Sequence, residues 1–156
     1  MKIRTYQPRD AEGVARVYRR SVQELGPRHY TVEQVAAWAS CAPDAAAFHA
    51  RASDGRTFIV ATDDADQVIA FIDLEADGHI DVLYASPEAA GRGFAWLLCA
   101  TAEEIARAGG MTRLYSEVSE GALPLFLRRG FTRLHRRDLK IGNVAIHNYA
   151  VEKALG

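Results

Sequence analysis

The segment SPEAAGRGFAWLL, residues 86–98, follows the apolar run HIDVLYA and leads into a long stretch rich in alanine and leucine. Its two glycines stand where a helix should begin, although glycine costs a helix about 1 kcal/mol relative to alanine. Their use here indicates that some group has to approach the backbone closely. This succession of strand, glycine turn and helix decides the fold that we expect.

The glycine turn has the features of an anion site. Free N–H groups at a helix N-terminus point outward, and the helix dipole adds partial positive charge. Such an end binds phosphate when small residues let the anion approach. Gly91 and Gly93 carry no Cβ atom, and Arg92 can add a charged hydrogen bond. For a bare Gly-x-Gly, a plain turn with close packing of helix and strand is the alternative.

Two common phosphate-binding loops do not match the segment. A P-loop needs Gly-Lys-Ser/Thr, which the sequence lacks. The dinucleotide fingerprint needs Gly or Ala where Trp96 stands, and its acidic ribose partner is missing near Met111. The glycine turn therefore belongs to neither class.

Length and composition indicate one soluble domain, which we expect to span residues 1–156. A net charge of -1 argues against a nucleic-acid or anionic membrane partner, so the basic segment RLHRR, residues 133–137, is expected to be a solvated strand face. Cys41 and Cys99 lie far apart without a metal or redox motif. No apolar run approaches the roughly 20 residues that span a bilayer, and MKIRTYQPRD lacks a signal-peptide core, so a cytoplasmic location is expected.

Hydrophobic periodicity and turn residues predict an alternation of strands and helices. Helices are expected at residues 10–25, 31–39, 44–53, 91–108 and 122–129, with capping residues Asp10, Thr31 and Asp44 at the first three. Strands are expected at residues 2–6, 56–62, 67–76, 79–85, 113–118, 131–140 and 144–152. This order predicts an α/β domain with a mixed, mostly antiparallel sheet of about six to seven strands flanked by helices, including at least one βαβ crossover.

Two correctly spaced motifs resemble the GNAT N-acetyltransferase superfamily. The first is AGRGFA, residues 90–95, which after an apolar strand and a proline turn is similar to the family's acetyl-CoA loop, except that Ala90 replaces Gln or Arg. The second is VSEGALPLFLRRGF, residues 118–131, which is similar to the family's strand, helix and Gly-Phe segment. HYTVEQVAAWA and DGHIDVLYASP also resemble a bacterial branch of the superfamily. The order of elements agrees along nearly the whole chain.

The resemblance implies acetyl-CoA as cosubstrate and direct attack of an acceptor amine on its thioester. In the family the pantetheine arm pairs with the strand before the loop, which implies backbone contacts from Leu83, Tyr84 and Ala85. The other residues implied at the cofactor are Gly91, Arg92, Gly93, Phe94, Ala95, Trp96, Ser119 and Phe126. Tyr30 and Trp38 lie in the region that walls the acceptor side in relatives, although Trp38 also fits an ordinary core. No metal is implied, and a monomer or homodimer is expected.

A base is expected because generating a neutral lysine-like amine, of pKa ~10.4, costs about 4–5 kcal/mol near pH 7. His79, Asp81, Leu83 and Ala85 should share one face of a strand by its two-residue period. Aspartate is a poor strand former, so Asp81 is a conflict of the kind that functional sites produce. In relatives, acidic or histidine side chains serve as base at the positions of His79 and Asp81. The alternatives are that Asp81 accepts from a nearby N–H or arginine, and that His79 is an exposed turn residue.

Phe126 departs from the family, because many members place there a tyrosine that protonates the leaving thiolate. A thiol pKa near ~8.5 makes the thiolate a tolerable leaving group without that help. Two functions are therefore weighed. His79 and Asp81 favour an N-acetyltransferase, whereas Ala90 and Phe126 favour a catalytically idle CoA-binding sensor or interaction module. Small metabolites, antibiotics, polyamines and protein N-termini all stay open as acceptors.

Overall fold

The computed structural model describes residues 2–156. The strands are β1 (Lys2–Thr5), β2 (Thr57–Thr62), β3 (Val68–Leu74), β4 (His79–Ile80), β5 (Leu83–Ala85), β6 (Arg113–Val118), β7 (Thr132–Ile141) and β8 (Val144–Ala154). The α-helices are α1 (Ala11–Arg20), α2 (Val32–Ser40), α3 (Ala45–Ala52), α4 (Phe94–Ala108) and α5 (Leu123–Arg128). A π-helical segment (Ser21–Leu25) and 3-10 turns (Pro8–Asp10 and Gly26–Arg28) complete the helical part.

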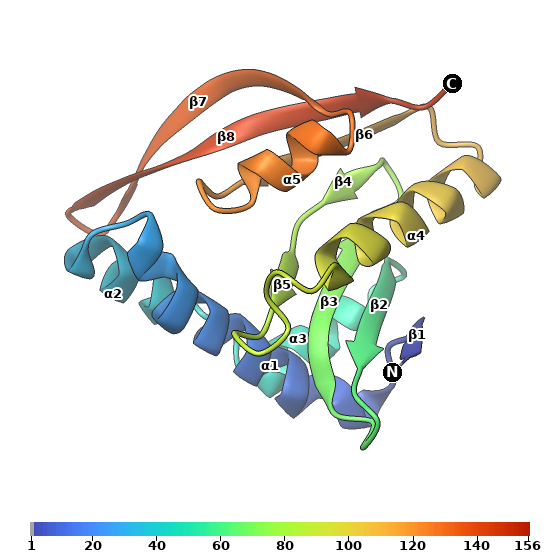
Figure 1. The fold of residues 1–156 in the computed structure, drawn as a ribbon, viewed down its shortest axis with the longest axis horizontal. Helices are drawn as coiled ribbons and strands as arrows, with labels where there is room; N and C mark the ends of the chain where they lie inside the picture. The colour runs from blue at the N-terminus through green and yellow to red at the C-terminus, as the bar shows by residue number, and fades with distance from the viewer. Residues whose placement is uncertain (1) are drawn as a thin grey trace.

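The strands form two four-stranded sheets, in the orders β1-β2-β3-β5 and β4-β6-β8-β7. Every pairing is antiparallel except that of β4 with β6, which is parallel and is connected through α4. The mixed, mostly antiparallel architecture with a crossover is therefore confirmed. The structure has more strands than the six to seven expected, because the single strand expected at 79–85 is divided between the two sheets (Figure 1).

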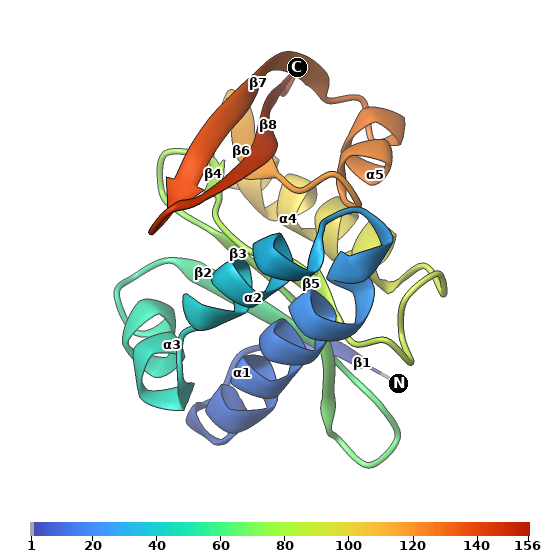
Figure 2. The same cartoon turned by 90° about the vertical axis from the view of Figure 1, so that its left-hand side faces the viewer.

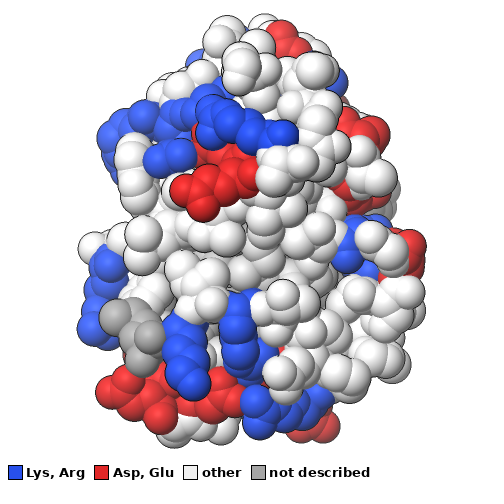
Figure 3. Space-filling view, turned by 90° about the vertical axis from the view of Figure 1, so that its right-hand side faces the viewer, with Lys and Arg blue, Asp and Glu red and all other residues white. Residues whose placement is uncertain are grey.

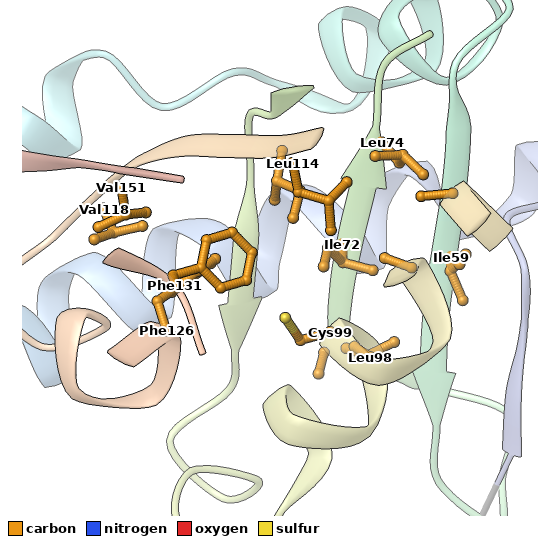
Figure 4. Close-up of a cluster of buried hydrophobic side chains, with 14 of the residues drawn as sticks. Ile59, Ile72, Leu74, Leu98, Cys99, Leu114, Val118, Phe126, Phe131 and Val151 are labelled. Carbon is orange, nitrogen blue, oxygen red and sulfur yellow. The ribbon is translucent and has the colours of Figure 1, made fainter. Parts of the chain in front are cut away.

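Two hydrophobic clusters hold the layers together. One lies between α4 and the inner faces of both sheets, and Figure 4 shows Leu98 and Cys99 of α4 near Ile72 of β3. The other lies on the opposite face of β3, where α1 and α3 cover the first sheet (Figure 2). Burial of apolar surface contributes roughly 25 cal/mol per Å², so these two clusters supply most of the driving force for folding.

Local capping signals account for two of the three helix starts that we predicted. Thr31 forms a capping box with Gln34 at α2, and the carboxylate of Asp44 accepts the N–H of Ala47 at α3. Both predictions are confirmed. The predicted cap at Asp10 is wrong: its buried carboxylate accepts the N–H of Gln7 and a bidentate contact from the guanidinium of Arg4 instead. An ion pair with β1 thus replaces the cap and ties the start of α1 to the first sheet.

No helix within residues 2–156 is long and apolar enough to cross a membrane. On the face shown in Figure 3, basic and acidic side chains are interspersed. This mixture agrees with the net charge of -1 and presents no broad field of one sign on that face.

Candidate active site

The two sheets diverge within the segment 79–85. His79 and Ile80 pair in parallel with β6, whereas pairing with β3 begins at Leu83. Asp81 and Val82 form the transition between the two sheets (Figure 1). Ile80 and Leu83 pack in the same hydrophobic cluster although they are three positions apart. Regular alternation would place them on opposite faces, so the expectation that 79, 81, 83 and 85 share one face is wrong.

A buried carboxylate stabilises this transition. Oδ1 of Asp73 accepts the backbone N–H groups of Asp81 at 2.8 Å and Val82 at 2.9 Å. Its Oδ2 accepts from Nη1 of Arg56 at 2.7 Å, and its side chain is 0% exposed. Burial raises the pKa of Asp73, against the opposing effect of its hydrogen bonds. Because a side chain satisfies these two N–H groups, the backbone can leave β6 and cross to β3 without orphaned donors.

The divergence opens two adjoining cavities of about 290 Å³ each. Both are lined by Tyr30, Trp38, Leu83, Tyr84, Ser119 and Ala122. The first, which we call the cleft, is also lined by residues of β6 and of the β7–β8 hairpin. The second continues past Ala85 to Ala90 and Gly91. Among the described strands, β5 is an edge strand whose one partner is β3, so its other edge offers backbone donors and acceptors to a ligand.

The glycine turn leaves open space at the beginning of α4. Gly91 has φ 76° and Gly93 has φ 86°, and a Cβ atom at either position would meet no atom within 4 Å. Positive φ is the reason why glycine is used at both positions. Gly93 is the N-cap residue and has no side chain to accept from the first N–H groups of the helix. These donors and the space in front of them fit a phosphate group.

The side chains of this loop have different surroundings. The guanidinium carbon of Arg92 lies 5.8 Å from the ring centroid of Phe94. Phe94 itself is buried in the core, so only its backbone is available to a ligand. Trp96 is 39% exposed, and the guanidinium carbon of Arg129 lies 4.4 Å from its ring centroid. Ala95 is half-buried in the first turn of α4.

Asp81 and His79 have different surroundings. Asp81 lines the cleft and is an ion-pair partner of Arg51 at 3.4 Å and Arg56 at 3.7 Å. His79 does not line the cleft. Its Nδ1 lies 2.7 Å from Oε1 of Glu75 and its Nε2 lies 2.9 Å from Oε1 of Glu117. Burial alone would lower the pKa of His79, but the two carboxylates raise it above its usual value.

Tyr30 and Trp38 lie together where the two cavities meet. Their rings contact edge to face at a centroid distance of 5.6 Å. The hydroxyl of Tyr30 donates to the carbonyl of His147 and accepts the N–H of Glu120. Burial raises the pKa of Tyr30, which keeps its phenol neutral. Nε1 of Trp38 donates to the hydroxyl of Tyr18 at 3.2 Å, which fixes the indole against α1.

Ser119 and Phe126 line the cleft near the start of α5. Oγ of Ser119 accepts the N–H of Ala122 at 3.3 Å. Phe126 is 1% exposed, and its ring contacts that of Phe131 edge to face at 4.9 Å. Phe126 is therefore both a core residue and part of the cleft wall.

The sequence motifs missed the polar residues on the far wall of the cleft. Glu117 and His147 line it, and His147 pairs with Glu120, which also accepts from the hydroxyl of Tyr149. The hydrogen bond from His147 lowers the pKa of Glu120. These residues meet because β8 pairs with β6, and no local pattern marks them. Within the described chain, no cluster of three or more histidine, cysteine or acidic residues could hold a metal ion.

Comparisons with known proteins agree with this architecture. The family model described as acetyltransferase (GNAT) domain matches residues 27–152. A GCN5-related N-acetyltransferase from Rhodopseudomonas palustris is 33% identical, with TM-score 0.89 and coverage of 99% of this chain and 95% of that one. A phosphinothricin acetyltransferase from Sinorhizobium meliloti is 21% identical, with TM-score 0.79 and coverage of 99% and 88%.

Among curated proteins, the uncharacterized N-acetyltransferase YafP of Escherichia coli is 24% identical over 149 residues, which is 96% of this chain and 93% of that protein. The glycine loop, the divided strand and the cleft between the sheets thus occur in a chain that matches the family model over most of its length. The chain belongs to the GNAT acetyltransferase family.

Proposed function

We propose that this protein transfers an acetyl group from acetyl-CoA to a primary amine, by direct attack of the amine on the thioester. The observation that carries the proposal is the open glycine turn at the start of α4, next to the second cavity, which runs along β5 and adjoins the cleft. Family membership supports acetyl transfer. The Sinorhizobium meliloti enzyme, which has the same fold, was solved in complex with AcCoA, and PaiA from Thermoplasma acidophilum was solved with coenzyme A.

In this proposal the coenzyme is held mostly by backbone groups. The N–H groups of residues 91–96 bind the pyrophosphate, with help from the guanidinium of Arg92. The free edge of Leu83–Ala85 pairs with the pantetheine amides, and Ser119 and Phe126 lie beside the thioester end. Acetyl-CoA supplies the activated acetyl group. Tyr30 and Trp38 wall the side from which the amine enters.

Asp81 is the proposed base, acting directly or through a water molecule. It lines the cleft next to β5, so the base and the coenzyme edge share one rigid segment. The raised pKa of His79 favours its protonated form, which has no free nitrogen to accept a proton. His79 therefore acts as a charged neighbour that holds Glu117 at the cleft wall.

Coenzyme binding is tested by thermal unfolding of matched glycine variants. A ligand at about 100 times its Kd adds about 2.7 kcal/mol to the stability of the native state. Gly93→Glu should abolish the CoA-dependent rise in Tm, because its carboxylate enters the phosphate space. Gly110→Glu is the control, since Gly110 also has positive φ and open space but lies at the far end of α4. An unchanged rise in folded Gly93→Glu contradicts the binding site.

Catalysis is tested by release of free thiol from acetyl-CoA with a panel of amines. Asp81→Asn should lower kcat by ~10²–10⁴-fold while CoA binding persists. Asp54→Asn is the control, because Asp54 also contacts Arg56 but does not line the cleft. Near-normal turnover of Asp81→Asn would make Asp81 structural. CoA binding without thiol release from any amine would favour the sensor module instead.

The acceptor side is tested by KM for the amine. Trp38→Ala should raise this KM more than it raises the KM for acetyl-CoA, because the indole lines the cleft as well as the cavity that continues toward the glycine turn. Tyr30→Phe keeps the ring and serves as the conservative partner variant. Unchanged amine KM in both folded variants would locate the acceptor elsewhere.

A further inference from the structure

The β7–β8 hairpin forms one wall of the cleft. Toward the end of β7, side chains that line the cleft alternate with side chains that are exposed to solvent. Arg137, Leu139 and Ile141 are half-buried and line the cleft, whereas the residues between them are exposed. The tip of the hairpin reaches α2, where Nε2 of Gln34 donates to the carbonyl of Ala145 at 3.0 Å (Figure 1). This contact holds the wall against the helical side of the cleft. One residue of the basic segment 133–137 therefore faces the cleft, and the segment is not solvated throughout.

Arg137 is a cation without a counter-charge. Its Nη1 donates to Oδ1 of Asn148, its neutral cross-strand neighbour, at 3.2 Å. Within residues 2–156 no carboxylate lies within ion-pair distance of its guanidinium. The adjacent Arg136, on the exposed face, is instead paired with Asp138 at 3.0 Å. A half-buried guanidinium loses hydration, so it gains most from an anion that enters the cleft.

The acids of the cleft are already compensated. Asp81 has two arginine partners, of which Arg51 lies 3.4 Å away. Glu117 lies 2.9 Å from His79. His147, which also lines the cleft, is paired with Glu120 in the turn after β6. Arg137 is thus the uncompensated charge of the cleft in the described part of the chain, and its sign is positive.

The rest of the cleft surface is mainly apolar or aromatic, with Leu139, Ile141, Ile146 and Trp38 among its lining residues. Its volume of about 290 Å³ suits a small molecule rather than a folded partner. A ligand that uses all of these features has an apolar body and one anionic group. A guanidinium binds a carboxylate through two parallel hydrogen bonds, which also fixes orientation.

We propose that the acceptor is a small aminocarboxylate with an apolar side chain, and that Arg137 binds its carboxylate. This inference rests on the proposed amine acetylation. The carboxylate anchored at β7 would leave the amine free to face the opposite wall, where Asp81 lies on the segment between the sheets.

The test compares matched amines in the thiol-release assay. L-Leucine, L-leucinamide and 3-methylbutylamine share a branched chain and a primary amine, but only the first carries a carboxylate. The corresponding sets built on methionine and phenylalanine widen the panel. At least one aminocarboxylate should exceed its two partners ~10–100-fold in kcat/KM, the size of one charged hydrogen bond. The amide has the less basic amine, so a preference for the acid over the amide cannot come from amine ionisation.

The variant arm uses two arginines of the same strand. Arg137→Gln should raise KM for the preferred aminocarboxylate ~10–100-fold, with the KM for acetyl-CoA and the activity on the matched alkylamine unchanged. Arg136→Gln, on the exposed face, should leave all of these constants unchanged. The CoA-dependent rise in Tm reports whether each variant retains its fold.

The outcomes separate this inference from the proposed function. Turnover only of amines that lack an acid group overturns the aminocarboxylate assignment and leaves amine acetylation standing. Equal kinetics of Arg137→Gln and the wild type on the aminocarboxylate overturns the role of Arg137. Thiol release from no member of this panel overturns the aminocarboxylate assignment. Amine acetylation is then judged by the wider panel of amines, and coenzyme binding by the glycine variants.

Discussion

Replacing Asp73 by alanine tests whether a buried side chain stabilises the opening between the two sheets. The substitution removes the acceptor for two backbone N–H groups and the partner of Arg56. Breaking a buried ion pair from one side costs about 3–5 kcal/mol. Each N–H left unsatisfied would add about 1–3 kcal/mol if nothing relaxed. Because water can reach the neighbouring cleft, we expect a total loss of about 3–5 kcal/mol in the free energy of unfolding.

The assay is urea unfolding followed by tryptophan fluorescence, with the midpoint and the slope analysed together. Asp73→Asn keeps Oδ1 as an acceptor but loses the charge, so it should cost about 1.5–3 kcal/mol. Asp54→Asn is the matched control, because Asp54 contacts the same guanidinium from the surface, where its side chain is 45% exposed. That change should cost less than about 1 kcal/mol. An Asp73→Ala variant no less stable than Asp54→Asn would refute the reasoning.

Three further predictions concern other parts of the fold. Two carboxylates raise the pKa of His79, so its contribution to stability is fully present below its unfolded-state pKa of about 6.5 and is lost as pH rises through the folded-state pKa. The difference in unfolding free energy between wild type and His79→Gln should therefore shrink as pH rises above about 6.5, and a constant difference in urea titrations contradicts this. Gly78→Ala should lower the free energy of unfolding by about 1–3 kcal/mol more than Gly55→Ala does. Both glycines have positive φ, but only a Cβ at Gly78 would lie 2.0 Å from a backbone carbonyl oxygen. Equal Tm values of the two variants would contradict this. A thiol reagent should modify the exposed Cys41 quickly in the native protein and Cys99 only after unfolding, because burial raises the pKa of Cys99 to about 12; rapid loss of both thiols would overturn this.

Most of the fold and the glycine turn could be predicted because their signals are local. A capping box, a turn glycine and a periodic apolar stripe act over a few residues, so the sequence alone indicates where α2, α3 and the β7–β8 hairpin begin and end. The sequence predicted a turn with open space at Gly91 and Gly93, and the structure adds that both glycines have positive φ.

The cleft could not be predicted in the same way, because contacts between distant segments form it. Asp73 accepts N–H groups from residues that follow a turn, and this interaction divides one expected strand between two sheets and shifts its alternation. In the sequence, Arg137 is one member of a basic strand. The pairing of β7 with β8, and of β8 with β6, places it in the lining of the cleft. The sequence by itself therefore determined the family, the elements and the glycine turn. Only the tertiary structure decided which charges meet in the cleft, because ion pairing and burial depend on the register between strands far apart in the chain.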